Sequence, residues 1–368
     1  MIPQAAKAED LPLIEKLSND VFRSNPADGK TMFAEFPDLF SVDNLENIRI
    51  IKVDDIPVSN ISYTVRNVRI SSSVISAASL GAVCTYEEHR GKGYATMLLN
   101  DCMENMRKQG VDVLIISGDR RMYTNAGSRH CGVSYRFNVN RKIDGSDKNI
   151  TLTELSPENY PLIAKIYAGE NVRFERSYDE FVKLLDSRKF LRKTTDVRKI
   201  IGINYLGELC GYMCLTVNDR KGFVHDCAGD GNLLVEAVIK IVNSGIADDI
   251  SARLLPRHNG ALKTLEKRGI GYTRDFLNGT FVMMNFEDLM EKLKPYFYQI
   301  TSSSLLDKVR FLNTEKGYCI KFGQARYETD DPQEILNLVF GEGKTGFKEL
   351  DEAIFPVPFP DPFSLNYI

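Results

Sequence analysis

The stretch Arg90-Gly91-Lys92-Gly93-Tyr94-Ala95 lies between an apolar run over residues 77–84 and a helical pattern over residues 96–103. This order predicts a strand, a glycine-containing loop and a helix. Small residues at positions 91, 93 and 95 let the backbone approach an anion closely, and the first N–H groups of a helix have no intrahelical partner. We therefore expect the loop to bind a pyrophosphate, with the basic side chains at positions 90 and 92 adding positive charge.

The spacing within this loop separates it from other nucleotide-binding loops. A dinucleotide-binding loop has a third glycine and a later ribose-binding acid, and a Walker loop has Gly-Lys-Ser/Thr; this sequence has neither pattern. The order Arg-x-x-Gly-x-Ala resembles the pyrophosphate loop of the GNAT acetyltransferase superfamily, and residues 5–22 and 112–117 resemble the first strand and helix and the fifth strand of that family. The alternative is an ordinary strand-to-helix turn with an exposed basic face.

Length and composition limit the class of protein. A chain of 368 residues is long enough for two or three domains, and 43% hydrophobic with 26% charged residues is typical of globular proteins. A formal net charge of −3 makes nucleic acid and acidic membrane surfaces poor partners. The sequence has neither a membrane-spanning apolar run nor a signal-peptide pattern, so we expect a cytoplasmic protein with no membrane association.

Cysteine and histidine usage bears on redox state and metals. The seven cysteines show no paired C-x-x-C spacing, which predicts buried free thiols in a reducing compartment. The four histidines do not cluster with them, and we expect no metal.

The chain shows signs of an internal duplication. Residues 141–147 are polar and read as a linker, and residues 152–163 then repeat the strand, cap and helix pattern of residues 5–14. We expect strands over residues 198–205 and 209–217 and a helix over residues 231–243. Where the first block has its phosphate loop, residues 225–232 carry two aspartates and no arginine, so the second block is expected not to bind the cofactor.

This order of predicted domains resembles that of the enhanced-intracellular-survival (Eis-type) acetyltransferases. The resemblance implies an α+β, mixed α/β protein with tandem GNAT-like folds: a catalytic domain at 1–143, a degenerate second GNAT-like domain at 148–286 and a small sterol-carrier-like domain with a docking tail at 287–368. It also implies a possible homo-oligomer. Two departures are the Asn-Ala-Gly-Ser-Arg sequence at 125–129, in place of the family's Arg-Phe-Gly-Tyr-Gly, and a shorter C-terminal block.

The resemblance assigns chemical roles within the first domain. Backbone N–H groups of Val83, Cys84 and Thr85 would face the acetyl and pantetheine parts of acetyl-CoA. Tyr123, four residues before a glycine, would be the general acid, because a phenol is protonated at neutral pH. A packing tyrosine, or a role for His130 instead, is the alternative. Cys84 lies on an apolar strand with no adjacent histidine, which favours a buried thiol over a covalent nucleophile.

The general base is absent from the expected strand, because residues 76–85 contain no carboxylate. The tail at residues 355–368 has four prolines and many apolar residues, which predicts an ordered segment that docks. In the Eis-type family the terminal carboxylate serves as base, so the resemblance implies that role for the α-carboxylate of Ile368. The alternative is a tail that serves packing alone.

Aromatic and acidic residues before the second strand indicate an acceptor pocket that would suit a cationic amine: an aminoglycoside, a polyamine or a lysine side chain would each fit. These residues are Phe22, Phe33, Phe36, Phe40, Asp28, Glu35 and Asp38. An amphipathic helix with core phenylalanines would give the same pattern. The leading hypothesis is an acetyl-CoA-dependent N-acetyltransferase acting on a primary amine of a small molecule or lysine. A non-catalytic acyl-CoA-binding regulator and a longer-chain acyltransferase remain as alternatives.

Overall fold

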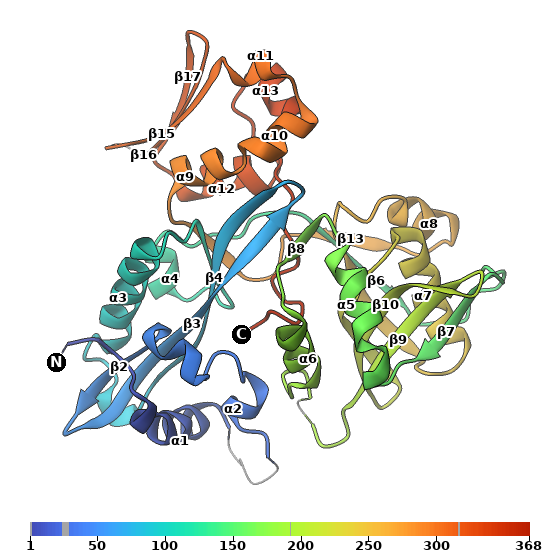
Figure 1. The fold of residues 1–368 in the computed structure, drawn as a ribbon, viewed down its shortest axis with the longest axis horizontal. Helices are drawn as coiled ribbons and strands as arrows, with labels where there is room; N and C mark the ends of the chain where they lie inside the picture. Colours follow the sequence, from blue (N-terminus) through green and yellow to red (C-terminus); the bar gives the residue numbers. More distant parts are fainter. Residues whose placement is uncertain (1, 24–28, 192, 316) are drawn as a thin grey trace. The chain divides into compact units, whose positions relative to one another are not determined.

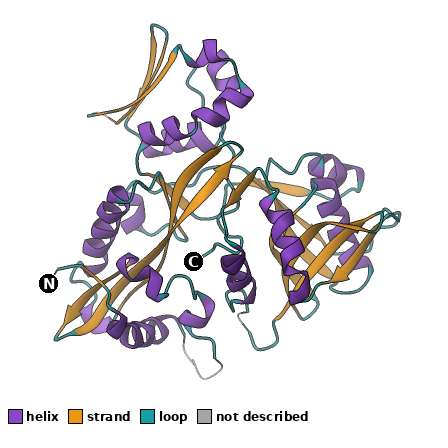
Figure 2. Cartoon of the chain, viewed as in Figure 1, coloured by secondary structure: helices purple, strands orange, loops and turns teal. Residues whose placement is uncertain are grey.

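The computed structural model describes residues 2–23, 29–191, 193–315 and 317–368. The chain divides into two compact units. The first unit comprises Met1–Gly132, Asn278–Pro362 and Asn366–Ile368, and the second comprises Val133–Leu277 and Phe363–Leu365. Helices and strands occur in both units, which confirms the predicted mixed α/β class (Figures 1 and 2).

A mixed sheet forms the centre of the first unit. The strands that the first unit contributes to it are β1 (Gln4–Ala5), β2 (Ile48–Val53), β3 (Ile56–Ile70), β4 (Ser73–Thr85), β5 (Val113–Ile116) and β14 (Thr280–Met283). They lie in the order β1-β2-β3-β4-β5-β14. Only β4 and β5 run parallel in this series, and the other neighbours are antiparallel. The parallel pair brings the carboxyl ends of β4 and β5 to one edge, where the loops that follow them can form a site.

Helices cover both faces of this sheet (Figure 1). Helices α1 (Leu11–Phe22) and α2 (Met32–Glu35) lie on one face, and α3 (Tyr94–Lys108) and α4 (Arg121–Asn125) lie on the other. The same part of the chain also contains the 3-10 helices η1 (Ala8–Asp10), η3 (Val42–Asn47) and η4 (Glu87–His89). In α3 the buried residues Leu98, Cys102 and Met106 recur at four-residue spacing, so one helix face packs on the sheet. The strand and helix predicted over residues 5–22 are present as β1 and α1, and the strand predicted over residues 112–117 is present as β5.

The second unit contains a similar sheet. Its elements are β6 (Ser134–Val139), β7 (Ile150–Glu154), η5 (Pro157–Asn159), α5 (Tyr160–Ala168), β8 (Val172–Phe174), α6 (Tyr178–Asp186), β9 (Val197–Tyr205), β10 (Glu208–Asn218), β11 (Lys221–Ala228), α7 (Gly231–Asn243), β12 (Asp249–Leu254), α8 (Ala261–Lys267) and β13 (Tyr272–Asp275). The strand order is β13-β6-β12-β11-β10-β9-β7. Strand β11 is antiparallel to β10 and parallel to β12, as β4 is to β3 and β5. The predicted strands and helix of this block are confirmed as β9, β10 and α7.

The two sheets exchange strands along the chain. Strand β6 follows α4 in sequence but pairs with β12 and β13 of the second sheet. Strand β14 follows the strands of the second sheet in sequence but pairs with β5 of the first sheet. The compact units change at 132 and 278, because long-range strand pairing determines where such units begin and end. The domain boundaries expected near 143 and 286 stay predictions.

The C-terminal block packs with the first unit. It contains α9 (Phe286–Lys292), α10 (Lys294–Ile300), α11 (Ser303–Leu306), β15 (Val309–Thr314), β16 (Gly317–Phe322), β17 (Ala325–Thr329), α12 (Pro332–Phe340) and α13 (Lys348–Ala353). Its strands form an antiparallel three-stranded sheet. The ring of Phe286 meets those of Phe311 and Tyr318 edge-on and ties α9 to this sheet. The sterol-carrier-like assignment of this block stays a prediction.

The tail at residues 355–368 is buried through its apolar side chains. Val357 donates its backbone N–H to the carbonyl oxygen of Val339 (2.7 Å). Phe359 packs edge-on against Phe281 and Phe340, with ring centroids 5.4 Å apart in both pairs. Such burial keeps the end of the chain ordered.

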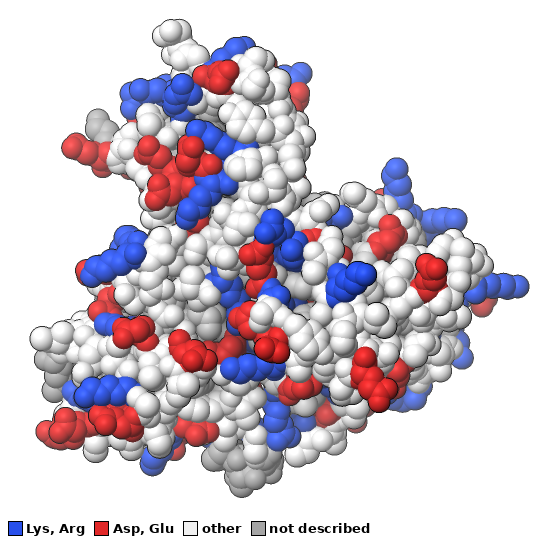
Figure 3. All heavy atoms as spheres, viewed as in Figure 1, with Lys and Arg blue, Asp and Glu red and all other residues white. Residues whose placement is uncertain are grey.

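Several compositional expectations can be compared with the structure. All seven cysteines are free thiols. Within the described ranges, no cluster of three or more His, Cys, Asp or Glu side chains is arranged to hold a metal ion. The same part of the chain contains no helix with the length and apolar character needed to cross a membrane. On the face that Figure 3 draws, acidic and basic side chains are interspersed.

Candidate active site

Strand β4 changes its pairing near its carboxyl end. Its parallel pairing with β5 ends at Leu80 and Ile116, and its register with β3 shifts between Asn60 and Ser62. Ala82 lies in this irregular stretch with a φ of 50°, and its carbonyl oxygen accepts a bond from Asn60 Nδ2 (2.9 Å). The bulge re-aims the backbone of the residues that follow, among them Val83, which were predicted to contact the acyl group.

The predicted phosphate loop joins β4 to α3 and is open. Gly91 and Gly93 have φ values of 77° and 79°, and a Cβ at either position would meet nothing within 4 Å. Gly93 is the N-cap of α3, so the first N–H groups of a 15-residue helix follow it directly. Arg90 is exposed and donates from Nε to the carbonyl oxygen of Thr85 (3.2 Å). Lys92 Nζ lies 3.3 Å from His89 Nδ1.

This geometry fits a pyrophosphate group. The helix N-terminus, the exposed loop backbone and the two basic side chains supply donors and positive charge at one place. Tyr94 and Ala95 form the first turn of α3 and are partly buried. The ring of Tyr94 stacks beside His89, with centroids 6.4 Å apart. His89 thus packs against Tyr94 at the end of the glycine-containing loop.

Cys84 has the environment of a packing residue. It is 3% exposed, and burial raises the pKa of its thiol to about 12. Its Sγ lies 3.9 Å from Ser18 Oγ. Because the thiolate is the nucleophilic form, a thiol held protonated in this way is not activated for covalent catalysis. Any contribution of Cys84 to acyl-CoA binding would come from its backbone.

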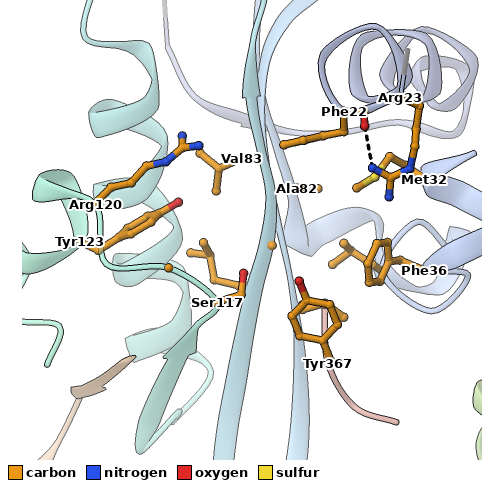
Figure 4. A pocket seen from close by; sticks show the side chains of 15 residues that line it. Phe22, Arg23, Met32, Phe36, Ala82, Val83, Ser117, Arg120, Tyr123 and Tyr367 are labelled. Carbon is orange, nitrogen blue, oxygen red and sulfur yellow. Dashed lines mark hydrogen bonds between the residues drawn. The ribbon is translucent and has the colours of Figure 1, made fainter. Parts of the chain in front are cut away.

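A cavity of about 240 Å³ lies at the bulge of β4, within the first unit. It is lined by Phe22, Arg23, Met32, Phe36, Leu39, Leu80, Gly81, Ala82, Val83, Ser117, Gly118, Arg120, Tyr123, Tyr367 and Ile368. Figure 4 shows Tyr123 and Arg120 on the α4 side of β4 and the side chains of α1 and α2 on the other side. Residues from both faces of β4 therefore line one cavity, at the point where the pairing of β4 with β5 ends.

Tyr123 reaches this cavity from α4. Its side chain is 5% exposed, and its hydroxyl points toward β4 near Val83 (Figure 4). Burial raises the pKa of Tyr123, and the charge of Arg120 opposes part of that rise. The phenol is thus protonated at neutral pH and has a proton to donate. His130 is not among the lining residues; its Nδ1 donates to the carbonyl oxygen of Gly279 (3.0 Å).

The C-terminal residue reaches the same cavity from the opposite end of the chain. Ile368 is 6% exposed and packs with the apolar cluster that includes Ile14, Phe36 and Ile50. A Cβ on Gly81 would lie 2.9 Å from the main-chain carbonyl carbon of Ile368, so only glycine admits this approach. The structure therefore places the main chain of Ile368 beside β4, a strand that carries no carboxylate of its own.

The aromatic and acidic set predicted for the acceptor is only partly at the cavity. Phe22 and Phe36 line it, whereas Phe33 and Phe40 stack on each other with centroids 4.3 Å apart. Glu35 forms an ion pair with Arg23, and Asp38 forms one with Arg66. Asp28 lies outside the described residues. Both described acids of this set are thus neutralised by arginines, and the described lining residues include no aspartate or glutamate.

The structure divides the predicted site residues into two groups. Val83, Tyr123 and Ile368 meet at the cavity; Cys84, Thr85 and residues 90–95 are not part of its lining and form the strand end and loop that follow. Sequence reasoning missed Gly81, Arg23 and Tyr367. A glycine inside an apolar strand pattern often marks a close backbone approach, so Gly81 carried a signal; the other two carried none.

The described residues of the second unit include no open counterpart of the predicted phosphate loop. At the N-terminus of α7, the side chain of Asp230 accepts bonds from the N–H groups of Asn232 and Leu233. A Cβ on Gly231 would lie 2.7 Å from the carbonyl oxygen of His258 and 2.8 Å from that of Asn259. A carboxylate and two carbonyl oxygens therefore occupy the surroundings of this helix end, which disfavours an anionic ligand.

Comparisons with known proteins identify the class of the first domain. The family described as Acetyltransferase (GNAT) domain matches residues 3–130. A GCN5-related N-acetyltransferase from Anabaena variabilis is 14% identical, with a TM-score of 0.66 over 97% of this chain and 99% of that chain. A comparison with curated proteins found no match.

Two further solved structures share this fold. Eis1 from Mycobacterium abscessus is 13% identical, with a TM-score of 0.60 over 100% of both chains. A protein from Enterococcus faecalis described as a probable N-acyltransferase is 13% identical, with a TM-score of 0.59 over 79% of this chain and 74% of that chain. Residues 3–130 thus match the GNAT acetyltransferase domain, and the chain as a whole has a fold similar to those of Eis1 and the Anabaena variabilis protein. Enzymes of this class use an acyl-CoA.

Proposed function

We propose that the chain is an acetyl-CoA-dependent N-acetyltransferase that transfers acetyl to a primary amine of a small molecule or a lysine side chain. The observation that carries this proposal is the meeting of Tyr123 and the carboxylate of Ile368 at one cavity beside the splayed end of β4. A phenol and a carboxylate are an acid and a base of the kind that direct acetyl transfer to an amine requires.

In the proposed reaction the loop at residues 90–95 binds the pyrophosphate of acetyl-CoA. Backbone N–H groups of Val83, Cys84 and Thr85 hold the pantetheine and polarise the thioester carbonyl. The amine nitrogen attacks the carbonyl carbon and gives a proton to the carboxylate of Ile368. The carbon–sulfur bond then breaks, and the departing thiolate takes a proton from Tyr123. The products are an amide and free coenzyme A.

The cavity walls bear on the kind of amine. Phe22, Met32 and Phe36 supply apolar surface, and Arg23 has its charge matched by Glu35. One carboxylate can pair with one ammonium group, and the described walls offer no second acid for a polycation. We therefore favour acceptors with a single reactive amine on a largely apolar body over aminoglycosides or polyamines.

The proposal is tested first by calorimetric titration with acetyl-CoA. Wild type is expected to bind with a micromolar Kd. Arg90→Glu and Gly93→Asp should lose binding, since each places negative charge at the helix N-terminus and the second also forces a side chain into a left-handed backbone conformation. Lys108→Glu is the matched control, because it makes a charge reversal at the other end of the same helix.

The outcomes separate the alternatives. Binding followed by acetylation of members of an amine panel supports the proposal. Binding with no transfer or hydrolysis would instead support a non-catalytic acyl-CoA-binding regulator. Displacement of acetyl-CoA by a much tighter long-chain acyl-CoA would support a longer-chain acyltransferase. No binding to wild type would contradict all three.

A further inference from the structure

The two arginines that line the cavity differ in their partners. Arg23 has an acceptor for each of its three nitrogen atoms: Nε and Nη2 donate to the carboxylate of Glu35, and Nη1 donates to the carbonyl oxygen of Phe22 (2.7 Å). The side chains of Arg23 and Glu35 are only 26% and 11% exposed. The positive charge of Arg23 is therefore matched within the cavity wall.

The charge of Arg120 is not matched in this way. This residue directly precedes α4, and its exposed side chain lines the cavity. Within the described ranges, its guanidinium has no hydrogen-bond or ion-pair partner. A guanidinium carries a positive charge and five N–H donors in a planar arrangement. Arg120 therefore brings to the cavity a positive charge and donors that a ligand can use.

Arg120 lies close to the tyrosine proposed as the acid. The two residues are three positions apart at the start of α4, which places their side chains on the same face. In Figure 4 both side chains extend toward β4 near Val83. The charge of Arg120 opposes part of the rise in the pKa of Tyr123, so the guanidinium is within electrostatic reach of the phenol. An anion bound to Arg120 would lie near the reacting groups.

The rest of the cavity limits what such an anion belongs to. Its α1–α2 side is apolar, and the described lining residues include no aspartate or glutamate. The apolar side chains are those of Phe22, Met32, Phe36 and Leu39. A purely cationic amine meets the like charge of Arg120 here, which opposes binding. A molecule that carries an amine, an anionic group and an apolar body has a complementary surface for each part.

We propose that the acceptor is an amino acid with an apolar side chain, held by a bond between its carboxylate and the guanidinium of Arg120. The proposal rests on the amine acetylation proposed above, but it does not depend on which group takes the proton of the amine. A carboxylate and a guanidinium form two parallel hydrogen bonds, which fix orientation as well as charge. Because one carbon joins the carboxylate to the α-amine, the amine is then held on the side of β4 that Tyr123 occupies.

A phosphate of acyl-CoA is the other anion that would suit Arg120. The loop at residues 90–95 already offers the pyrophosphate a helix N-terminus and two basic side chains. We therefore assign the anion at Arg120 to the acceptor, and the experiments below distinguish the two sources.

The first measurement needs no turnover. N-acetyl-L-phenylalanine and N-acetylphenethylamine, which differ by the carboxylate, are titrated calorimetrically into the full-length protein. Wild type should bind the first compound about tenfold more tightly, and Arg120→Gln should bind both with similar affinity. Arg121→Gln is the matched control and should keep the preference, because Arg121 is an adjacent exposed arginine outside the cavity lining. Equal affinity of wild type for the two compounds would overturn the proposal.

The second measurement compares kcat/KM for L-phenylalanine with that for phenethylamine. Arg120→Gln should lower the ratio of the two values about tenfold, chiefly through the KM for L-phenylalanine. Comparing ratios between wild type and variant cancels both the different basicity of the two amines and any change in Tyr123. The Kd for acetyl-CoA should stay within about twofold.

An unchanged ratio with a higher Kd for acetyl-CoA would assign Arg120 to the cofactor and overturn the proposal. Acetylation of both amines with a ratio that does not respond to Arg120→Gln would refute carboxylate recognition and leave the proposed function standing. Failure of the proposed function is distinct, since no amine would then be acetylated, whichever of the two N-acetyl compounds wild type prefers.

Discussion

The terminal carbon of Ile368 lies 2.9 Å from the position that a Cβ would take on Gly81. This approach brings Ile368 to a strand that carries no carboxylate of its own, and it depends on the absence of a side chain at position 81. The same cavity receives the hydroxyl of Tyr123 from α4. The proposed acid therefore comes from helix α4, and the proposed base comes from residue 368 of the tail.

Gly81→Ala should displace the carboxylate, because its methyl group would overlap the terminal carbon of Ile368. We expect kcat to fall about tenfold to hundredfold, with the Kd for acetyl-CoA unchanged. Steady-state kinetics and calorimetry measure the two quantities. Gly271→Ala is the control, since a Cβ there would meet nothing within 4 Å. Unaltered kcat in Gly81→Ala would show that the position of the carboxylate does not limit turnover.

Removal of the terminal charge should reduce turnover without changing the tail's packing. A semisynthetic protein with an amide in place of the Ile368 carboxylate should lose about a hundredfold in kcat, the range expected for a general base. Addition of one glycine after Ile368 moves the carboxylate by about 3.5 Å and should have a similar effect. Wild-type turnover in both proteins would assign the tail to packing alone.

Tyr123→Phe should lower kcat by about a hundredfold, because the thiolate then leaves without a proton donor. Burial raises the pKa of Tyr123 above its usual value of 10.0, so the phenol stays protonated through the neutral and mildly alkaline range. A decline of wild-type kcat from loss of this proton is expected only above about pH 10, and it should vanish in Tyr123→Phe. Tyr298→Phe, at a tyrosine that is 52% exposed, serves as the control. If wild type and both variants show the same dependence of kcat on pH, Tyr123 is excluded as the acid.

Glu35→Gln should expose the cavity to the unmatched charge of Arg23. Glu35 is 8% exposed and accepts a 2.8 Å bond from Arg23 Nε. Without this carboxylate, the KM for an amine that binds as a cation should rise several-fold, while kcat changes little. Asp43→Asn removes an exposed acid outside the cavity lining and is the control. A KM that does not respond would place the bound amine away from the α1–α2 wall.

Stability should decline at alkaline pH because of buried thiol and phenol groups. Burial raises the pKa of Cys84 from 9.0 to about 12 and that of Tyr63 from 10.0 to about 12. The unfolded chain then releases these protons first, so the stabilisation is complete below about pH 9 and is lost as the pH rises toward 12. Urea unfolding at several pH values measures this slope. Cys84→Ala should make it shallower, and an identical slope would contradict the assignment.

Local sequence was sufficient to predict the loop at residues 90–95 and the elements around it. Gly91 and Gly93 have left-handed backbones, and a helix follows at Tyr94 as the pattern indicated. These features depend on neighbours in sequence, whose steric and hydrogen-bonding preferences can be read from residue type. The repeated strand and helix order of the second unit was predictable for the same reason.

Only the tertiary structure decided the exchange of β6 and β14, the neutralisation of Glu35 by Arg23 and the approach of Ile368 to Gly81. Each joins residues that are distant in the chain, and strand pairing or charge pairing over such distances depends on how whole sheets pack. The sequence determined by itself the open glycine-containing loop, the absence of a carboxylate on β4 and an apolar tail. Folding decided which part of the tail lies against β4, because only the packed sheet brings Ile368 next to Gly81, which has no side chain to block it.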